Sequence, residues 1–257
     1  MRFSMITLGG LMLAAATPAM AQDETEPADA ITVSGSVQGV TDYRFRGVSQ
    51  TGEDAAVNAG VTVAHESGLY ASVWASTIKD DKAPALAGYG DAEVDLSVGY
   101  GKTFSNGVGI DVGLLYYLYP IDKVSGLDTD FFEPYASISY TMGPVTAKVG
   151  ANYAWSGQAG LAGNDSLYLR GDVTVAIPGT PVSLLGHVGH SDGQLAFFTP
   201  TEKYWDWSLG AEVSASFAKL GVQYVDTDVT KGPLPNFDYK DFIGADETVL
   251  FYLTLSF

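Results

Sequence analysis

Residues 248–257 read TVLFYLTLSF, and this stretch decides how the rest of the chain is interpreted. Alternate residues from Val249 to Phe257 are large and apolar, whereas the residues between them are mostly hydroxylated. A side-chain period of two predicts a β-strand with one apolar face. Ten residues are about the length with which a tilted strand crosses the hydrocarbon of a bilayer. The sequence ends on Phe257 without a polar tail, and an unpaired apolar strand would invite aggregation in water. We therefore expect this strand to belong to a barrel embedded in a membrane.

The chain begins with the pattern of a secretory signal peptide. Arg2 provides a positive charge, residues 6–16 form a short apolar run, and the AMA sequence at residues 19–21 fits a small-x-small cleavage site. The apolar run is too short to span a membrane as a helix, which disfavours the alternative of a membrane anchor. We expect residues 1–21 to be removed by cleavage after Ala21 and the protein to be exported.

The chain is acidic and has no cysteine. Its formal net charge is −17, from 30 acidic and 13 basic residues. Repulsion from phosphates argues against nucleic acid as a partner, and the absence of cysteine excludes disulfides and a lipid-modified cysteine. Residues 22–30 (QDETEPADA) have no periodicity and are expected to form a flexible acidic lead-in. Residues 31–257 are then the barrel domain.

Alternation of apolar and polar residues recurs from Ile31 to the end of the chain and predicts about twelve strands. The segment around residues 91–101 is the clearest, whereas Tyr70 and Trp74 leave the orientation of the third strand open. The segment at residues 220–226 is short, and its alternation is weak. The expected strands cover approximately residues 31–46, 55–65, 69–78, 91–101, 108–119, 132–140, 145–155, 167–177, 182–190, 204–217, 220–226 and 248–257.

The connections between these strands alternate strictly between short and long. Short links such as ESG at residues 66–68 and PGTP at residues 178–181 alternate with longer polar or glycine-rich segments such as residues 79–90 and 227–246. Outer-membrane barrels show this alternation, with short periplasmic turns and long outer loops. The sequence therefore predicts an all-β fold, a closed antiparallel transmembrane β-barrel of about twelve strands. The alternative is a soluble β-sandwich, which also alternates.

Aromatic residues on the apolar face favour the membrane barrel over the sandwich. They gather at the two ends of the expected strands, which is where amphipathic rings are favoured at the two interfaces of a membrane. The expected girdle at the loop end consists of Tyr43, Phe45, Phe132, Tyr153, Trp155, Trp205 and Trp207, and the girdle at the turn end of Tyr100, Tyr140, Phe217 and Phe257.

Three segments carry a resemblance to a known family. Residues 33–51 (VSGSVQGVTDYRFRGVSQT), 63–76 (VAHESGLYASVWAS) and 92–104 (AEVDLSVGYGKTF) closely resemble a proteobacterial family of outer-membrane porins often called TorF-like. The resemblance is strong over residues 33–120 and implies a location and a fold rather than a substrate. The last strand is similar to the C-terminal strand of bacterial outer-membrane barrels, which implies that Phe257 acts as an assembly signal read by the barrel-assembly machinery.

The polar face of the expected strands carries charges that would line the lumen. Twelve strands lie between a barrel that its side chains fill and one that leaves an open channel, so a narrow and partly obstructed pore is expected. Opposed charges would orient polar solutes across such a pore, or they would simply pair with one another and fill the interior. The candidates are Arg44, Arg46, Asp91, Glu93, Asp95, Glu133, Lys148, Arg170, Asp172 and Glu212.

These observations predict a porin for small polar solutes or ions, with a weak preference for cations because acidic residues dominate the outer loops. One alternative is a non-conducting barrel that binds ligands or surfaces through its loops. Outer-membrane lipid and lipopolysaccharide are the expected surroundings.

An enzyme is the other alternative. His65 and Ser67 have the His-x-Ser spacing of outer-membrane lipid hydrolases, and His190 precedes Ser191. On the expected topology His65 lies at a periplasmic turn, away from the outer leaflet, so no enzymatic function is predicted. Neither a cofactor nor a metal site is expected, because carboxylate pairs such as Asp226 with Asp228 lack EF-hand spacing.

Overall fold

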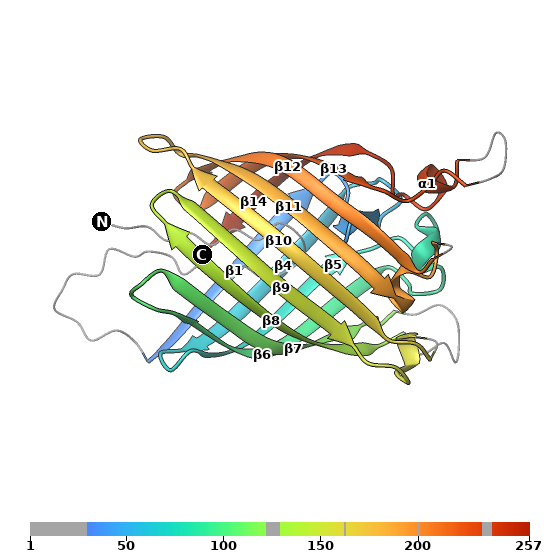
Figure 1. Cartoon of the computed structure of the whole chain (residues 1–257), viewed down its shortest axis with the longest axis horizontal. Helices are drawn as coiled ribbons and strands as arrows, with labels where there is room; N and C mark the ends of the chain where they lie inside the picture. The colour runs from blue at the N-terminus through green and yellow to red at the C-terminus, as the bar shows by residue number, and fades with distance from the viewer. Residues whose placement is uncertain (1–29, 122–128, 162, 200, 233–237) are drawn as a thin grey trace.

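The computed structural model describes residues 30–121, 129–161, 163–199, 201–232 and 238–257. These residues form a closed barrel of twelve antiparallel strands, which confirms the predicted fold (Figure 1). The predicted signal peptide, residues 22–29 of the predicted lead-in, and residues 122–128 of the long link between two predicted strands lie outside the described residues.

The barrel strands follow one another around the ring in chain order. The ring closes where β1 (Ile31–Val40) pairs with β14 (Thr248–Ser256), for example through Gly39 opposite Leu253. The other wall strands are β4 (Ala56–His65), β5 (Leu69–Thr77), β6 (Ala92–Thr103), β7 (Val108–Leu118), β8 (Phe131–Met142), β9 (Val145–Ala154), β10 (Ser166–Ala176), β11 (Val182–Gly193), β12 (Lys203–Ala215) and β13 (Ala218–Thr227).

The two ends of the barrel differ. Figure 1 shows the tight turns at one end, with the start of β1 and the end of β14, and the long connections at the other. We call these the turn end and the loop end. The long connections carry short helices, which are η1 (Pro84–Leu86), η2 (Ala159–Leu161), η3 (Gln194–Ala196) and α1 (Tyr239–Phe242). Among the described residues, no helix is long and apolar enough to cross a membrane.

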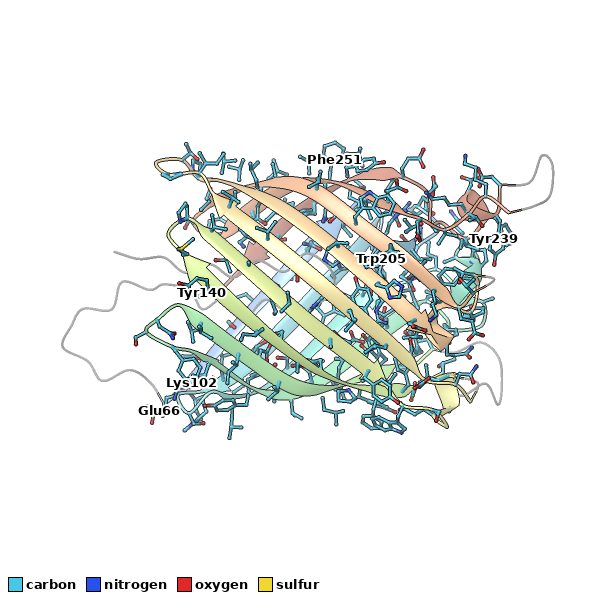
Figure 2. All side chains as sticks on the ribbon, in the orientation of Figure 1. Glu66, Lys102, Tyr140, Trp205, Tyr239 and Phe251 are labelled. Atoms are coloured by element: carbon cyan, nitrogen blue, oxygen red, sulfur yellow. The ribbon has the colours of Figure 1, made fainter. Side chains whose placement is uncertain are left out.

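The outer surface of the barrel is apolar, which is the reverse of a water-soluble protein. Along β14, Phe251, Leu253 and Leu255 are exposed, whereas Leu250 points inward and is buried. Figure 2 shows Phe251 projecting away from the wall. Because side chains of a strand alternate between its faces, each wall strand presents one row outward and one row to the lumen. The predicted alternation therefore corresponds to an apolar exterior and a polar interior of the barrel.

Tyrosines that lie flat against the inner wall narrow the lumen. The ring of Tyr252 occupies the space that a Cβ on Gly221 would need, and the ring of Tyr135 does the same at Gly113. Glycine leaves the bare backbone on which an aromatic ring from the neighbouring strand can rest. The orientation of β5, which the sequence left open, is resolved in the same way, because Tyr70 points inward over Gly99.

The principal departure from the predicted fold is at the end of the first strand. The alternation predicted a strand to Arg46, but β1 ends at Val40 and the chain turns into the barrel. Two short strands, β2 (Arg44–Phe45) and β3 (Val48–Ser49), form a hairpin there, with Gly47 in the left-handed region at φ 84°. Residues 42–51, which we call the inserted segment, are buried except for the half-buried Phe45.

Several wall strands are longer than predicted, and two of them show the reason. β13 extends over Ala218–Thr227 rather than only residues 220–226, and β11 extends to Gly193 rather than His190. Both extensions are stabilised by complete ladders to their neighbours, so tertiary pairing rather than the local pattern sets their length.

Candidate functional site

The inserted segment is anchored across the lumen by Arg46. Its Nη2 donates to Glu133 Oε1 on β8 at 2.5 Å, and its guanidinium lies 4.3 Å from the ring centroid of Tyr168 on β10. Glu133 is fully buried and also accepts hydrogen bonds from the Tyr117 hydroxyl and the Asn152 amide, each at 3.1 Å. A buried charge is tolerated only when it is paired and hydrogen-bonded, and this network meets that condition for the carboxylate.

Aromatic contacts hold the other side of the segment. The Tyr43 hydroxyl donates to Glu93 on β6 at 2.9 Å, and its ring packs edge-on against Trp74 on β5. Phe45 packs edge-on against Tyr117 on β7. The prediction that Tyr43 and Phe45 belong to an outer aromatic girdle is therefore wrong, because both lie inside the barrel. Asp95 is also covered, at 4% exposure.

Arg44 ties the segment to the connection between β13 and β14. Its Nε donates to Asp42 at 2.7 Å and its Nη1 to the carbonyl oxygen of Asp246 at 2.6 Å. Arg44 and Arg46 were predicted to line the wall as part of the first strand. That placement is wrong, because both residues lie on the inserted segment, from which Arg46 reaches the wall and Arg44 reaches the connection between β13 and β14.

A histidine that the sequence analysis did not select lies on the opposite wall. His187 on β11 contacts Asp172 through Nδ1 at 2.6 Å and Asp206 through Nε2 at 3.0 Å. The Tyr168 hydroxyl is 3.1 Å from Asp206 Oδ1 and 2.9 Å from His187 Nε2. The sequence did contain a signal for an inward His187, because Ser183 and Ser191 are an even number of residues away and share its face of the strand. Leucine and glycine occur on both faces of this strand, however, so the alternation was hard to recognise.

A cavity of about 80 Å³ lies between the inserted segment and this wall. Charged side chains from four separate elements line it, together with amide and hydroxyl groups. The charged and amide members are Arg44, Arg46, Asn152, Arg170, His187, Asp206 and Gln223. Arg170 and Arg46, which the sequence analysis singled out independently, are thus brought together by the fold.

The remaining predicted lumen charges lie elsewhere. Glu212 faces inward near the turn end, where it pairs with Lys219 at 3.4 Å and accepts from the Tyr252 hydroxyl. Lys148 is half-buried on β9 opposite Asp172. Asp91 directly precedes β6 and is exposed, so it lies at the loop-end rim rather than on a wall strand as predicted.

Carboxylates gather outside the inserted segment at the loop end. Carboxylate oxygens of Glu53, Asp241 and Asp246 lie within 4.8 Å of one another, and Arg44 Nη2 is 3.6 Å from a carboxylate oxygen of Glu53 and of Asp246. Nearby, the ammonium groups of Lys79 and Lys82 lower the pKa of Asp54 to about 2. Within the cluster, burial and the neighbouring carboxylate of Asp246 raise the pKa of Glu53, so the cluster is fully anionic only above the ordinary carboxylate range of pH.

The other predicted girdle residues lie on the outward face. Figure 2 shows Tyr140 near the turn end and Trp205 near the loop end. On the neighbouring strands near the loop end, Tyr116, Phe132 and Trp155 form a continuous outward stack. Outward, exposed or half-buried members are Tyr100, Phe132, Tyr140, Tyr153, Trp155, Trp205, Trp207, Phe217 and Phe257.

The two His–Ser pairs have different geometries. His65 Nδ1 lies 2.9 Å from Ser67 Oγ, but it also accepts from the Ser67 backbone N–H at 3.1 Å, as in a capped turn. In the described part of the chain no carboxylate contacts His65 to orient it as a base. His190 packs outward against Trp205, whereas Ser191 faces the lumen, so this second pair lies on opposite faces of the wall.

Comparison with known proteins places this barrel among outer-membrane channels in its fold. It is similar to the NanC porin, with a TM-score of 0.56 and 13% identity over 87% of this chain and 98% of that one. It is also similar to an outer-membrane channel from Pseudomonas putida F1, with a TM-score of 0.50 and 12% identity over 91% of this chain and 99% of that one. At such identities the similarity shows the fold alone.

Sequence comparison gives the family. No curated protein matches the sequence. A family described as "Bacterial protein of unknown function (Gcw_chp)" matches residues 24–257, which include every strand of the barrel. The chain therefore belongs to the bacterial Gcw_chp family.

Proposed function

We propose that the protein is an outer-membrane channel through which small polar solutes and ions diffuse passively. The observation that carries this proposal is the closed barrel with an apolar exterior and a charged interior narrowed by the inserted segment. A buried ion pair such as that of Arg46 with Glu133 is not needed to stabilise a purely structural core, because apolar packing stabilises it equally well. The resemblance to TorF-like porins supports the same function.

The location follows from the same proposal. A signal peptide cleaved after Ala21 would deliver the chain to the periplasm, and Phe257 would present the last strand to the barrel-assembly machinery. The turn end would then face the periplasm and the loop end the outside, where long loops are found in such barrels. The outward aromatic residues would lie at the two interfaces of the outer membrane, in contact with lipid and lipopolysaccharide.

The proposed channel has a weak preference for cations. The cluster formed by Glu53, Asp241 and Asp246 lies at the loop end, where a low-dielectric wall focuses its field into the entrance. Arg44 offsets part of this charge, because its Nη2 lies 3.6 Å from two of the three carboxylates. The preference would be strongest at low salt, where screening is weakest.

The inserted segment also supports a second candidate, a barrel that does not conduct. Tyr43 and Arg46 bind Glu93 on β6 and Glu133 on β8, whereas Gly47 lies against Asp206 on β12 and Thr227 on β13, so the segment crosses the lumen. A fixed segment would block passage and leave the loops for binding, whereas a segment that moves would gate a channel.

Catalysis is not part of the proposal. A nucleophilic serine needs a base that is itself oriented by a third group. Ser67 and His65 make a turn at the end of the barrel opposite the loops, and their mutual hydrogen bonds are those of a local cap.

Single-channel recording separates the two candidates. Refolded protein is inserted into planar bilayers, and the same preparation is assayed for swelling of liposomes in neutral sugars of increasing size. We expect a small conductance with brief closures and a low size cut-off. Intact, folded barrels that show neither conductance nor swelling would support the non-conducting barrel instead.

A further inference from the structure

The cavity beside the inserted segment has the composition of a ligand site in the path of the proposed channel. Its volume of about 80 Å³ exceeds what one water occupies and is smaller than the roughly 150 Å³ of a cavity that binds benzene. It therefore has room for a group of a few heavy atoms. The role of such a site rests on the proposed function, because it concerns the solute that the channel would hold.

Two arginines present unused donors in this region. Arg46 Nη1 and Arg170 Nε are buried and have no hydrogen-bond partner among the described residues, and each side chain belongs to a residue that is only 8% exposed. Buried polar groups almost always have a partner, and an orphaned charged donor is especially costly. Each of these two donors therefore lacks an acceptor within hydrogen-bond distance.

Each carboxylate nearby has at least one oxygen that is already hydrogen-bonded, while Asp172 Oδ2 and Asp206 Oδ2 have no hydrogen-bond partner among the described residues. Glu133 accepts hydrogen bonds from Arg46 Nη2, from the Tyr117 hydroxyl and from the Asn152 amide. Asp172 and Asp206 are bound to the two nitrogens of His187. Asp172 Oδ2 comes no closer than 3.9 Å to Arg170 Nε, which is an ion pair but too long for a hydrogen bond.

The same region offers unused acceptors on its other side. Asp206 Oδ2 and Asn152 Oδ1 are buried without a partner among the described residues. Tyr168 and Asp206 cover the bare backbone of Gly189, since a Cβ on it would overlap the Tyr168 hydroxyl and lie 2.5 Å from Asp206 Oδ2. A ligand that satisfied the arginines with an acceptor could therefore satisfy these oxygens with a donor.

We propose that this cavity binds the carboxylate end of a small solute that carries a hydroxyl or ammonium group on the adjacent carbon. The carboxylate receives hydrogen bonds from the guanidinium groups of Arg46 and Arg170, because planar guanidinium donors match carboxylate geometry. The neighbouring donor group binds Asp206 Oδ2. Short 2-hydroxy and 2-amino acids share this chemistry. Binding must be weak enough to release the solute if it is to pass through.

Binding is measured without any ion flow, on refolded barrel in detergent, by titration calorimetry and ligand-observed NMR. The probes are glycolate and glycine, with acetate lacking the donor and glycolamide lacking the charge. We expect saturable binding of glycolate or glycine, weaker binding of acetate and none of glycolamide. The comparison of glycolate with glycine shows whether hydroxy or amino acids are preferred.

Matched variants locate the site. Arg170→Gln should weaken glycolate or glycine binding at least tenfold, whereas Lys219→Gln makes the same charge change in the lumen outside the cavity and should leave binding unchanged. Equal binding of glycolamide, absence of binding of both acids, or unchanged affinity in Arg170→Gln would overturn the proposal. If Arg170→Gln does not refold, the comparison of acid with amide on the wild-type barrel decides. Binding without conductance would reject the channel and keep the site.

Discussion

The ring of Phe257 covers the bare backbone of Gly35, and this contact completes the seam between the last and the first strand. The two residues exchange backbone hydrogen bonds of 3.0 and 3.1 Å, and a Cβ on Gly35 would overlap the phenyl ring. The ladder of β1 with β14 runs only from the pair Ser36–Ser256 to the pair Val40–Tyr252, which makes it the shortest ladder between wall strands. Phe257 therefore extends the closing seam by one residue beyond β14.

Removing this contact should impair barrel closure. We expect deletion of Phe257, or Phe257→Asp, to lower the fraction of protein that runs as a heat-modifiable folded barrel, both in cells and after refolding. Gly35→Ala should act in the same direction by about 1–3 kcal/mol, the usual cost of overpacking a close contact. Gly39→Ala on the same strand is the control, because a Cβ there meets nothing within 4 Å. A normal yield of folded barrel without Phe257 would show that the seam closes by backbone pairing alone.

The wall could be predicted from the sequence because each strand has one apolar face. In β7, Val112 and Leu114 alternate with Asp111 and Gly113, and the structure places the first pair outward and the second inward. Such alternation is a local property, so it can be read without knowledge of the neighbours. Strand lengths were less predictable, because pairing with adjacent strands extends β13 and β11.

The inserted segment could not be predicted in the same way. Tyr43 and Phe45 continue the apolar parity of β1, and Arg44 and Arg46 continue the polar parity, so the pattern is that of an unbroken strand. The strand ends because of tertiary contacts. The Tyr43 hydroxyl donates a hydrogen bond to Glu93, and Arg46 donates one to Glu133, which is 87 residues away in the sequence. Gly47 was the one local signal, as it adopts a positive φ at the tip of the hairpin.

Weakening the anchor of the inserted segment should enlarge the conductance. Arg46→Gln removes one partner of a buried ion pair, which typically costs about 3–5 kcal/mol because the other charge is left uncompensated. We expect the segment to leave the lumen more often, with larger single-channel conductance and a higher size cut-off in liposome swelling. Lys203→Gln at the loop end makes the same charge change on an exposed pair and serves as the control.

The double variant Arg46→Gln/Glu133→Gln tests the cause of that change. With both charges gone, amide groups can hydrogen-bond across the same gap, so conductance should return part of the way to the wild-type value. A double variant that conducts at least as much as Arg46→Gln would show that the ion pair does not hold the segment in place.

Lipid chemistry should not depend on the His–Ser turn. Ser67→Ala removes the hydroxyl that contacts His65 Nδ1, yet it leaves the backbone hydrogen bond of this turn in place. We expect the phospholipid and lipopolysaccharide profiles of cells producing wild-type and variant protein to be the same by mass spectrometry. Lipid hydrolysis by the purified wild type that disappears in Ser67→Ala would establish an enzyme.

Ion preference depends on which charges face the solution at the entrance. Glu93 and Asp95 were expected to contribute there, but the inserted segment covers Glu93 and leaves it 2% exposed. The cluster of Glu53, Asp241 and Asp246 lies outside the segment, and two of its members are exposed. The field at the entrance should therefore come mainly from this cluster, partly offset by Arg44.

Reversal potentials in a salt gradient measure this preference. We expect wild type to favour potassium over chloride weakly, more so at low salt, and Glu53→Gln/Asp241→Asn to reduce the preference. Glu93→Gln/Asp95→Asn should change it less, because those carboxylates are covered. Glu66→Gln, at the turn end (Figure 2), is the single-charge control. Chloride preference in wild type would instead assign selectivity to the arginines of the lumen, where Arg46 and Arg170 would set the sign of the field at the narrowest point.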